Sequence, residues 1–302
     1  MKQYALTTKL KLMAVAIAIA IVGIAAHTPG TVRAASGGLT ISPTAIDKEI
    51  APGASYTGEI VVINQGELDY SYKVYASPYS VDGEEYKPYF TPVKGAVDVT
   101  SWFAFTKTGG DLQIGNQDAI PFTVAVPQGT PAGSYYATVF AETEDKGASG
   151  VVTRKRVGTV MYLRVSGKVS ERGHVDSWSV PWLQKDPLTA TLKQANTGSV
   201  HYPAQVKVTV SDIFGGPKFT FERKPQILPQ KLRRIEVTWT NGATFGLFKV
   251  GGEVKYLGKT EKLPTKYVFV ADTPMRVLTI GIVILFAASM TFLGMRRVVR
   301  KK

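Results

Sequence analysis

The 302-residue chain contains no cysteine, and this absence removes several classes of site at once. Without cysteine there is no disulfide, no thiol nucleophile, no iron–sulfur cluster and no zinc–thiolate centre. Histidine is scarce as well: His27 lies in an N-terminal apolar region, which leaves His174 and His201, both interpreted as surface or cap residues. Neither has a metal-binding spacing such as H-E-x-x-H, and no G-x-S-x-G occurs. The sequence predicts no catalytic residue, no cofactor and no metal, and therefore no enzyme.

A convincing amphipathic helix is also lacking between residues 36 and 273. Residues 205–210 and 235–239 alternate apolar and polar side chains, which is typical of a strand with one buried face. Turn signals separate about seven such runs before residue 166 and about seven after it. The pattern predicts an all-β protein with two tandem immunoglobulin-like β-sandwiches, at residues 36–167 and 168–273.

Two long apolar stretches flank this region. Residues 12–26 follow three lysines and precede a small-residue site, which predicts a signal peptide at residues 1–34. Residues 277–295 form an uncharged run of 19 residues, long enough to cross about 30 Å of hydrocarbon as one transmembrane helix. Residues 296–302 hold five basic side chains and should stay cytoplasmic. We therefore expect a single-pass membrane protein whose N-terminal ectodomain is extracellular.

The formal net charge of +13 is unevenly distributed. Residues 36–167 carry 10 basic and 14 acidic side chains, whereas residues 168–273 carry 16 basic and 9 acidic ones. The two apolar ends account for the rest of the positive charge. Since the exported part is close to neutral, the composition predicts no nucleic-acid partner. The basic second half is interpreted either as a surface for anionic polymers or lipids or as a solvated face.

Residues 78–98 stand out because they do not show a strand pattern. This stretch contains Tyr79, Tyr86, Tyr89 and Phe90, together with three prolines. Loops of this length in compact domains are uncommon and often functional. We predict that these four aromatic residues form a ligand-binding surface. The alternative is that their rings fold back and cover the end of the sandwich.

Charged clusters leave two further possibilities open. Glu142 and Glu144 lie in an apparent hairpin and could serve a polysaccharide-acting enzyme. Arg154 and Arg156 begin a long strand and should project from the same face, because alternate residues of a strand share a face. They would either meet a polyanion or protect the edge of the sheet from aggregation.

Several motifs resemble those of one known family. They are the Ile-Ser-Pro at 41–43, the Pro-Gly turn at 51–54, the segment 127–136, the segment 196–201, and residues 208–215 and 227–229. With the signal peptide, two sandwiches, C-terminal helix and basic tail, the chain is similar to the WxL-interacting proteins of Gram-positive surfaces. The resemblance implies a peptidoglycan-binding first domain and a second domain that binds a surface protein, either a WxL-bearing protein or a host protein.

The leading hypothesis is thus a non-enzymatic, membrane-anchored protein of the cell envelope that attaches to cell-wall polymer and to a surface protein partner. The alternative from another class is a pilus-type chaperone or assembly module that acts by β-strand pairing. A polysaccharide-acting enzyme is the third candidate.

Overall fold

The computed structural model describes residues 38–95, 97–146, 152–240, 242, 245–271, 278 and 281, without the side chains of 144–146 and 152–153. The predicted signal peptide at 1–34 and basic tail at 296–302 lie outside these residues. So does the predicted membrane helix at 277–295, apart from residues 278 and 281. Within the described part of the chain, no helix has both the length and the apolar character needed to span a membrane.

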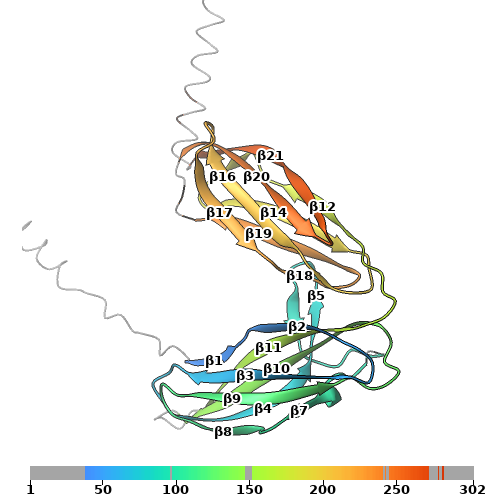
Figure 1. Cartoon of the computed structure of the whole chain (residues 1–302). Helices are drawn as coiled ribbons and strands as arrows, with labels where there is room; N and C mark the ends of the chain where they lie inside the picture. The colour runs from blue at the N-terminus through green and yellow to red at the C-terminus, as the bar shows by residue number, and fades with distance from the viewer. Residues whose placement is uncertain are drawn as a thin grey trace, which may run out of the picture. The chain divides into compact units, whose positions relative to one another are not determined.

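The described chain is all-β, as predicted, apart from one turn of 3-10 helix, η1 (Thr100–Trp102). Two sheets built from residues 39–165 form the first sandwich (Figure 1). One sheet has the order β1 (Leu39–Ser42), β3 (Ser55–Asn64), β9 (Gln117–Ala125), β7 (Phe103–Phe105). The other has the order β2 (Ala45–Ile50), β11 (Val152–Val165), β10 (Gly133–Lys146), β4 (Tyr70–Pro78), β8 (Gly109–Leu112).

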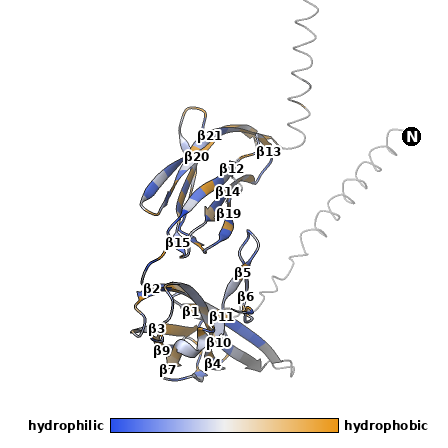
Figure 2. Cartoon of the chain, turned by 90° about the vertical axis from the view of Figure 1, so that its right-hand side faces the viewer, coloured by the Kyte–Doolittle hydropathy of each residue, from blue (hydrophilic) through white to orange (hydrophobic). Residues whose placement is uncertain are grey.

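The core of the first sandwich follows from strand alternation. Alternate side chains are buried in the second half of β3 and the middle of β9, including Ile60, Ile120 and Phe122. These side chains meet Val139 and Met161 of the opposite sheet in one apolar cluster. Figure 2 shows apolar segments along β3, β7 and β9. Burial of about 25 cal/mol per Å² of apolar surface stabilises this arrangement.

Residues 173–271 form the second sandwich in the same way. One sheet has the order β12 (Gly173–Ser179), β14 (Leu188–Asn196), β19 (Lys231–Trp239). The other has the order β13 (Leu183–Gln184), β21 (Lys259–Ala271), β20 (Phe245–Tyr256), β16 (Gln205–Asp212), β17 (Pro217–Arg223). A short pair, β15 (Tyr202–Pro203) and β18 (Gln226–Ile227), lies in the connections. The core is a separate cluster that includes Leu192, Val208 and Val250.

The same polar motif ends a strand in each sandwich. The Asn64 side-chain amide donates to the carbonyls of Leu68 and Leu112, while its oxygen accepts the Gly66 N–H. Asn196 makes the equivalent set with the carbonyls of Val200 and Ile227 and with the Gly198 N–H. Both asparagines are buried. Each satisfies three backbone groups that would otherwise lack partners, which holds the loop on the sandwich.

Some local features differ from what the sequence pattern indicates. Gly-Gly pairs are usual turn signals, but Gly109-Gly110 and Gly251-Gly252 lie within β8 and β20. A Cβ on Gly252 would lie 2.1 Å from the Lys207 carbonyl oxygen, so this glycine permits close approach of β16. Residues 78–98 also contain strands, because β5 (Ser80–Asp82) and β6 (Lys87–Tyr89) pair as a hairpin.

Candidate functional site

One long strand of the first sandwich extends beyond its neighbour. β11 pairs with β10 over its full 14 residues, but β2 covers its other side only from Val160 to Val165. The chain before β2 leaves β11 at Pro43, because β1 pairs with β3 in the opposite sheet. The last contacts are Val160 N–H to Thr44 O at 3.0 Å and Thr159 Oγ1 to Pro43 O at 2.6 Å. No strand of the described chain pairs with β11 on this side before Val160.

The hydrogen bonds to β2 show which backbone groups face this open side. Successive residues of a strand direct their N–H and C=O groups to alternate sides. The N–H groups of Val160 and Ser166 both donate toward the β2 side. Because the β10–β11 pairing has no register shift, Arg156 and Gly158 direct their backbone groups to the same side. These groups form a template for one further strand.

Aromatic side chains lie beside this edge on the outer face of the sheet. The ring of Phe140 has its centroid 4.8 Å from that of Phe90 and 5.9 Å from that of Tyr75. The Arg156 guanidinium lies over the Phe140 ring at 4.3 Å, a cation–π geometry. Gly158 makes room for the ring, since a Cβ there would lie 2.8 Å from Phe140 Cε1. We call Phe140, Phe90, Tyr75 and Arg156 the aromatic platform.

The remaining edge strands of the first sandwich are less suited to pairing with a further strand. β1, β7 and β8 have three or four residues each, and short edge strands are a common protection against unwanted pairing. β2 has six residues, and three consecutive ones are charged. The open side of β11 is therefore the candidate site of the first sandwich.

Of the four aromatic residues predicted as a ligand surface, the structure brings Tyr79 and Phe90 into ring contact with each other. Phe90 belongs to the aromatic platform, and Tyr79 has its ring 6.2 Å from Phe90. Tyr79 also lines a cavity of about 410 Å³ next to Tyr136. Tyr89 is 36% exposed and makes no ring contact within the described residues. Tyr86 is only 6% exposed, and its hydroxyl contacts Leu228 of the second sandwich.

Tyr86 fastens the β5–β6 hairpin to the second sandwich. Its φ of 58° is in the left-handed region, which is uncommon for a bulky residue. Its hydroxyl accepts the Leu228 N–H at 3.0 Å, and the Arg233 guanidinium lies 4.4 Å from its ring centre. Burial raises the pKa of Tyr86 to about 12, so the hydroxyl stays neutral. The neighbouring Glu84 carbonyl accepts the Arg234 N–H at 2.7 Å.

His201 makes a second connection between the sandwiches and is not the surface residue expected from sequence. It is 1% exposed, with Nδ1 2.7 Å from Ser134 Oγ and Nε2 3.2 Å from Asp47 Oδ1. The same Ser134 oxygen accepts the His201 backbone N–H at 2.9 Å, and Arg164 donates to the His201 carbonyl. The Asp–His–Ser combination therefore acts as a structural link, because the histidine is enclosed and the serine oxygen already accepts a backbone N–H.

Replacing Asp47 with Asn should weaken this link in a pH-dependent way. Burial raises the pKa of the Asp47 carboxyl, but hydrogen bonds from His201 and Gln226 and the Arg164 charge outweigh it, so the pKa is lowered. A lowered folded-state pKa gives stability that is present above the unfolded pKa of about 3.9 and lost at lower pH. The difference in free energy of unfolding between wild type and Asp47→Asn should therefore be larger at neutral pH than below about pH 3.

Urea denaturation of the full-length chain at both pH values measures this difference. Asp82→Asn is the matched control, since Asp82 is exposed and has no side-chain hydrogen bond among the described residues. A difference between wild type and Asp47→Asn that does not change with pH would contradict the assignment.

The acidic residues considered for polysaccharide cleavage have other roles where they are described. Glu142 accepts a hydrogen bond from the Tyr75 hydroxyl at 2.5 Å and pairs with Lys73 at 3.4 Å. The Tyr75 hydrogen bond is the main cause that lowers the pKa of Glu142. A general acid needs a raised pKa instead. The Glu144 side chain lies outside the described residues. No group of three or more His, Asp or Glu side chains suited to a metal ion occurs in the described part of the chain.

Part of the open edge was predicted from the sequence. Arg156 was singled out as a strand residue at a sheet edge, but Phe140 and Gly158 were not. A glycine inside a long strand often marks close approach of another group, so Gly158 was an available signal. The packing of Phe140 against it depends on the β10–β11 register.

Comparisons with known proteins concern the fold. No family model matches the chain, and no curated protein sequence matches it. The class 5 fimbriae chaperone CfaA has a TM-score of 0.38 and 13% identity, over 78% of this chain and 99% of that chain. The E. coli chaperone DraB has a TM-score of 0.38 and 14% identity, over 76% and 96%. The CsuC–CsuE chaperone–tip subunit complex of Acinetobacter baumannii Csu pili has a TM-score of 0.37 and 11% identity, over 78% and 99%.

These findings correct the family prediction. The assignment to the WxL-interacting proteins is wrong, since no family model matches the chain. The expectations that depended on this family are wrong with it: a Gram-positive surface, peptidoglycan as ligand, and a WxL-bearing or host protein as partner. The motifs that suggested the family have local structural roles, such as the buried Asn196 motif.

Proposed function

We propose that this protein is a non-enzymatic assembly module that binds an extended segment of another protein by β-strand pairing along the open side of β11. The observation that carries the proposal is that β11 continues past the point at which β2 leaves it, with Arg156 and Gly158 directing backbone groups outward. This is the alternative function considered from the sequence.

The chemistry of the edge defines what it would bind. Added backbone hydrogen bonds contribute about 1 kcal/mol each, so pairing alone gives modest affinity that depends little on sequence. Side chains of the incoming strand on the outer face would lie beside the exposed Arg156 guanidinium, which covers the buried Phe140 ring. An apolar or aromatic side chain at that position gains further contact area. We therefore expect a partner strand with alternating apolar residues.

Of the four aromatic residues singled out from the sequence, Phe90 fits this proposal best. Its ring packs edge-on against Phe140 and 5.4 Å from the Arg156 guanidinium. Tyr79 lies next to Phe90 and contributes to the same outer face. Tyr89 remains available to a ligand through its exposure, whereas Tyr86 is assigned to the contact with the second sandwich.

The cellular location belongs to the proposal and depends on the sequence alone. A signal peptide at residues 1–34 would export the chain, and an apolar helix at residues 277–295 would tether it. The basic residues 296–302 would keep the C-terminus on the cytoplasmic side. Both sandwiches would then meet partners outside the membrane.

Arg156→Pro tests the proposal. Proline has no N–H, and the Arg156 N–H faces the open side, so the ladder with β10 is retained. Displayed random peptides selected against the full-length chain should be rich in alternating apolar residues. Arg156→Pro should weaken their binding at least about tenfold, equivalent to 1.4 kcal/mol.

Thr238→Pro is the matched control, because it removes an edge N–H from β19 of the second sandwich. It should leave the affinity of the selected peptides unchanged. If Arg156→Pro binds them as tightly as wild type, the open side of β11 is not the binding site.

A further inference from the structure

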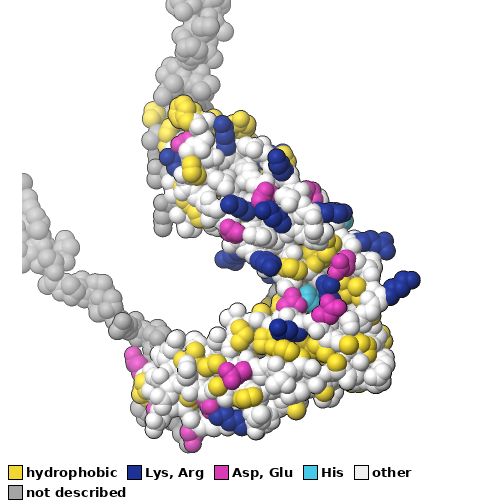
Figure 3. Space-filling model, viewed as in Figure 1, with side chains coloured by type: hydrophobic (Ala, Val, Ile, Leu, Met, Phe, Trp, Pro, Cys, Tyr) yellow, Lys and Arg dark blue, Asp and Glu magenta, His cyan; other side chains and the backbone are white. Residues whose placement is uncertain are grey.

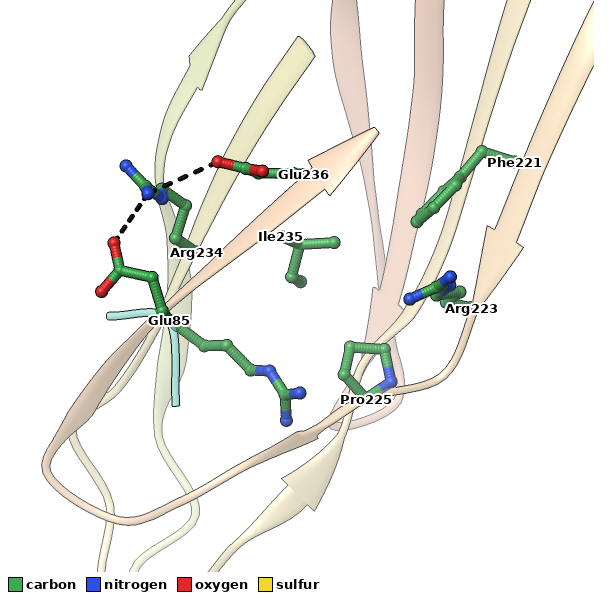
Figure 4. A pocket seen from close by; sticks show the side chains of 8 residues that line it. Glu85, Phe221, Arg223, Pro225, Arg234, Ile235 and Glu236 are labelled. Atoms are coloured by element: carbon green, nitrogen blue, oxygen red, sulfur yellow. Dashed lines mark ion pairs between the residues drawn. The ribbon is translucent and has the colours of Figure 1, made fainter. Parts of the chain in front are cut away.

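The second sandwich has an open side of its own. β19 ends one of its sheets and β17 ends the other, so neither strand has a strand neighbour on that side within the described residues. The two strands flank a cavity of about 270 Å³ (Figure 4). Phe221 and Arg223 of β17 line one side of it, and Ile235 of β19 lies opposite. This cavity is separate from the aromatic platform on β10 and β11.

One backbone position of the β19 edge is already used. The Arg234 N–H donates to the carbonyl of Glu84, which lies in the β5–β6 turn of the first sandwich. β19 pairs with β14 without a register shift, so Glu236 and Thr238 direct their backbone groups to the same side as Arg234. The β5–β6 turn therefore meets this edge at Arg234, and the edge continues beyond the contact for at least two outward-facing residues.

The charge of the cavity favours an acidic guest. Arg234 pairs with Glu85 at 2.7 Å and with Glu236 at 3.4 Å, so its charge is compensated. Arg223 is exposed, and no carboxylate of the described residues forms an ion pair with it or with Arg233. Figure 3 shows lysine and arginine side chains gathered over the second sandwich on the visible face.

The two unpaired guanidinium groups are held in place by other contacts. Arg233 donates to the Gln226 carbonyl at 2.7 Å and stacks on Tyr86. Arg223 lies 5.4 Å from the Phe221 ring centre. Both guanidinium groups line the same cavity, and each has further N–H donors that can bind a ligand. Arginine binds carboxylates with charge-assisted hydrogen bonds that are stronger than neutral ones.

We propose that the β19 edge binds an extended segment of a partner protein and that an acidic side chain of this segment enters the cavity between Arg223 and Arg233. Backbone pairing at Glu236 and Thr238 fixes the direction of the segment. The two guanidinium groups then favour segments that carry a carboxylate, because a neutral amide of the same shape leaves their charge uncompensated. The site is independent of the open side of β11.

A pair of synthetic peptides tests this proposal by fluorescence anisotropy with the full-length chain. The probe is Thr-Val-Thr-Glu-Thr-Val-Thr, and its partner carries Gln in place of Glu. We expect the Glu peptide to bind at least about tenfold more tightly than the Gln peptide, with the difference shrinking in high salt. Arg223→Glu should remove this preference, and Thr238→Pro should weaken both peptides.

Two control variants separate this site from its alternatives. Lys266→Glu makes the same charge reversal at an exposed residue of β21 that does not line the cavity, and it should keep the preference for Glu. Arg156→Pro should bind the Glu peptide as wild type does. Equal binding of the Glu and Gln peptides would overturn the proposal. Loss of Glu-peptide binding in Arg156→Pro with retention in Thr238→Pro would also overturn it and would assign the peptide to β11.

Discussion

Replacing Asn196 with alanine is expected to lower the free energy of unfolding of the second sandwich by about 3 kcal/mol or more, and Asn64→Ala should do the same to the first. Each buried asparagine satisfies two carbonyls and one N–H. Leaving a buried backbone group without a partner costs about 1–3 kcal/mol, and three groups lose their partner at once. Water that enters the space recovers part of this loss.

Urea denaturation measures both effects, with the tryptophans as local probes. Trp102 lies in the core of the first sandwich, and Trp239 packs on the core of the second. Each of the two substitutions should lower the urea concentration at the midpoint of the unfolding transition that the tryptophans report. Asn116→Ala is the control, because its amide makes only an exposed 3.4 Å hydrogen bond to Gln113. Unfolding midpoints that match the control would show that the motif does not support the fold.

The second large loss of stability is expected when Tyr86 is replaced with alanine. Tyr86→Ala removes a nearly buried ring, the hydroxyl that accepts the Leu228 N–H, and the stacking partner of Arg233. Loss of a buried aromatic side chain costs about 3–5 kcal/mol. Here the loss falls on the contact between the two sandwiches and not on either main core, since Tyr86 belongs to a separate cluster with Val81 and Leu228.

The expected result for Tyr86→Ala is faster amide exchange at Leu228 and two separate unfolding transitions, one for each sandwich. Tyr86→Phe keeps the ring and loses only the hydroxyl, so its cost should be about 1 kcal/mol. A single unshifted transition in Tyr86→Ala would contradict the role assigned to this residue.

The sequence predicted the features of this fold that depend on local patterning. Strands such as β3, β9, β14 and β16 alternate because one face is buried, and this period is visible in the residues themselves. The short strands β1, β5, β6 and β8 were missed. They have three or four residues, too few to show a period, and they form because a longer neighbour supplies the hydrogen bonds.

The candidate sites were only partly predictable, because they depend on contacts between distant residues. The long strand expected at Arg154 and Arg156 is β11, but its open side exists because the chain at Pro43 crosses to another sheet. Tyr86 was predicted as part of a ligand-binding surface, but its position depends on Leu228, which lies 142 residues further along the chain. The Asn-x-Gly motif at residues 196–198 contributed to the wrong family assignment. It holds a loop on the sandwich, and many unrelated sandwiches need the same packing.

Amide hydrogen exchange at Arg156 and Gly158 tests the central claim most directly. With the full-length chain alone, both amides should exchange rapidly, since they face the open side of β11. After addition of a selected peptide with alternating apolar residues, both should become protected, while the amides of Glu236 and Thr238 in β19 keep their rates. Unchanged exchange at Arg156 and Gly158 in the presence of a bound peptide would contradict strand pairing at this edge.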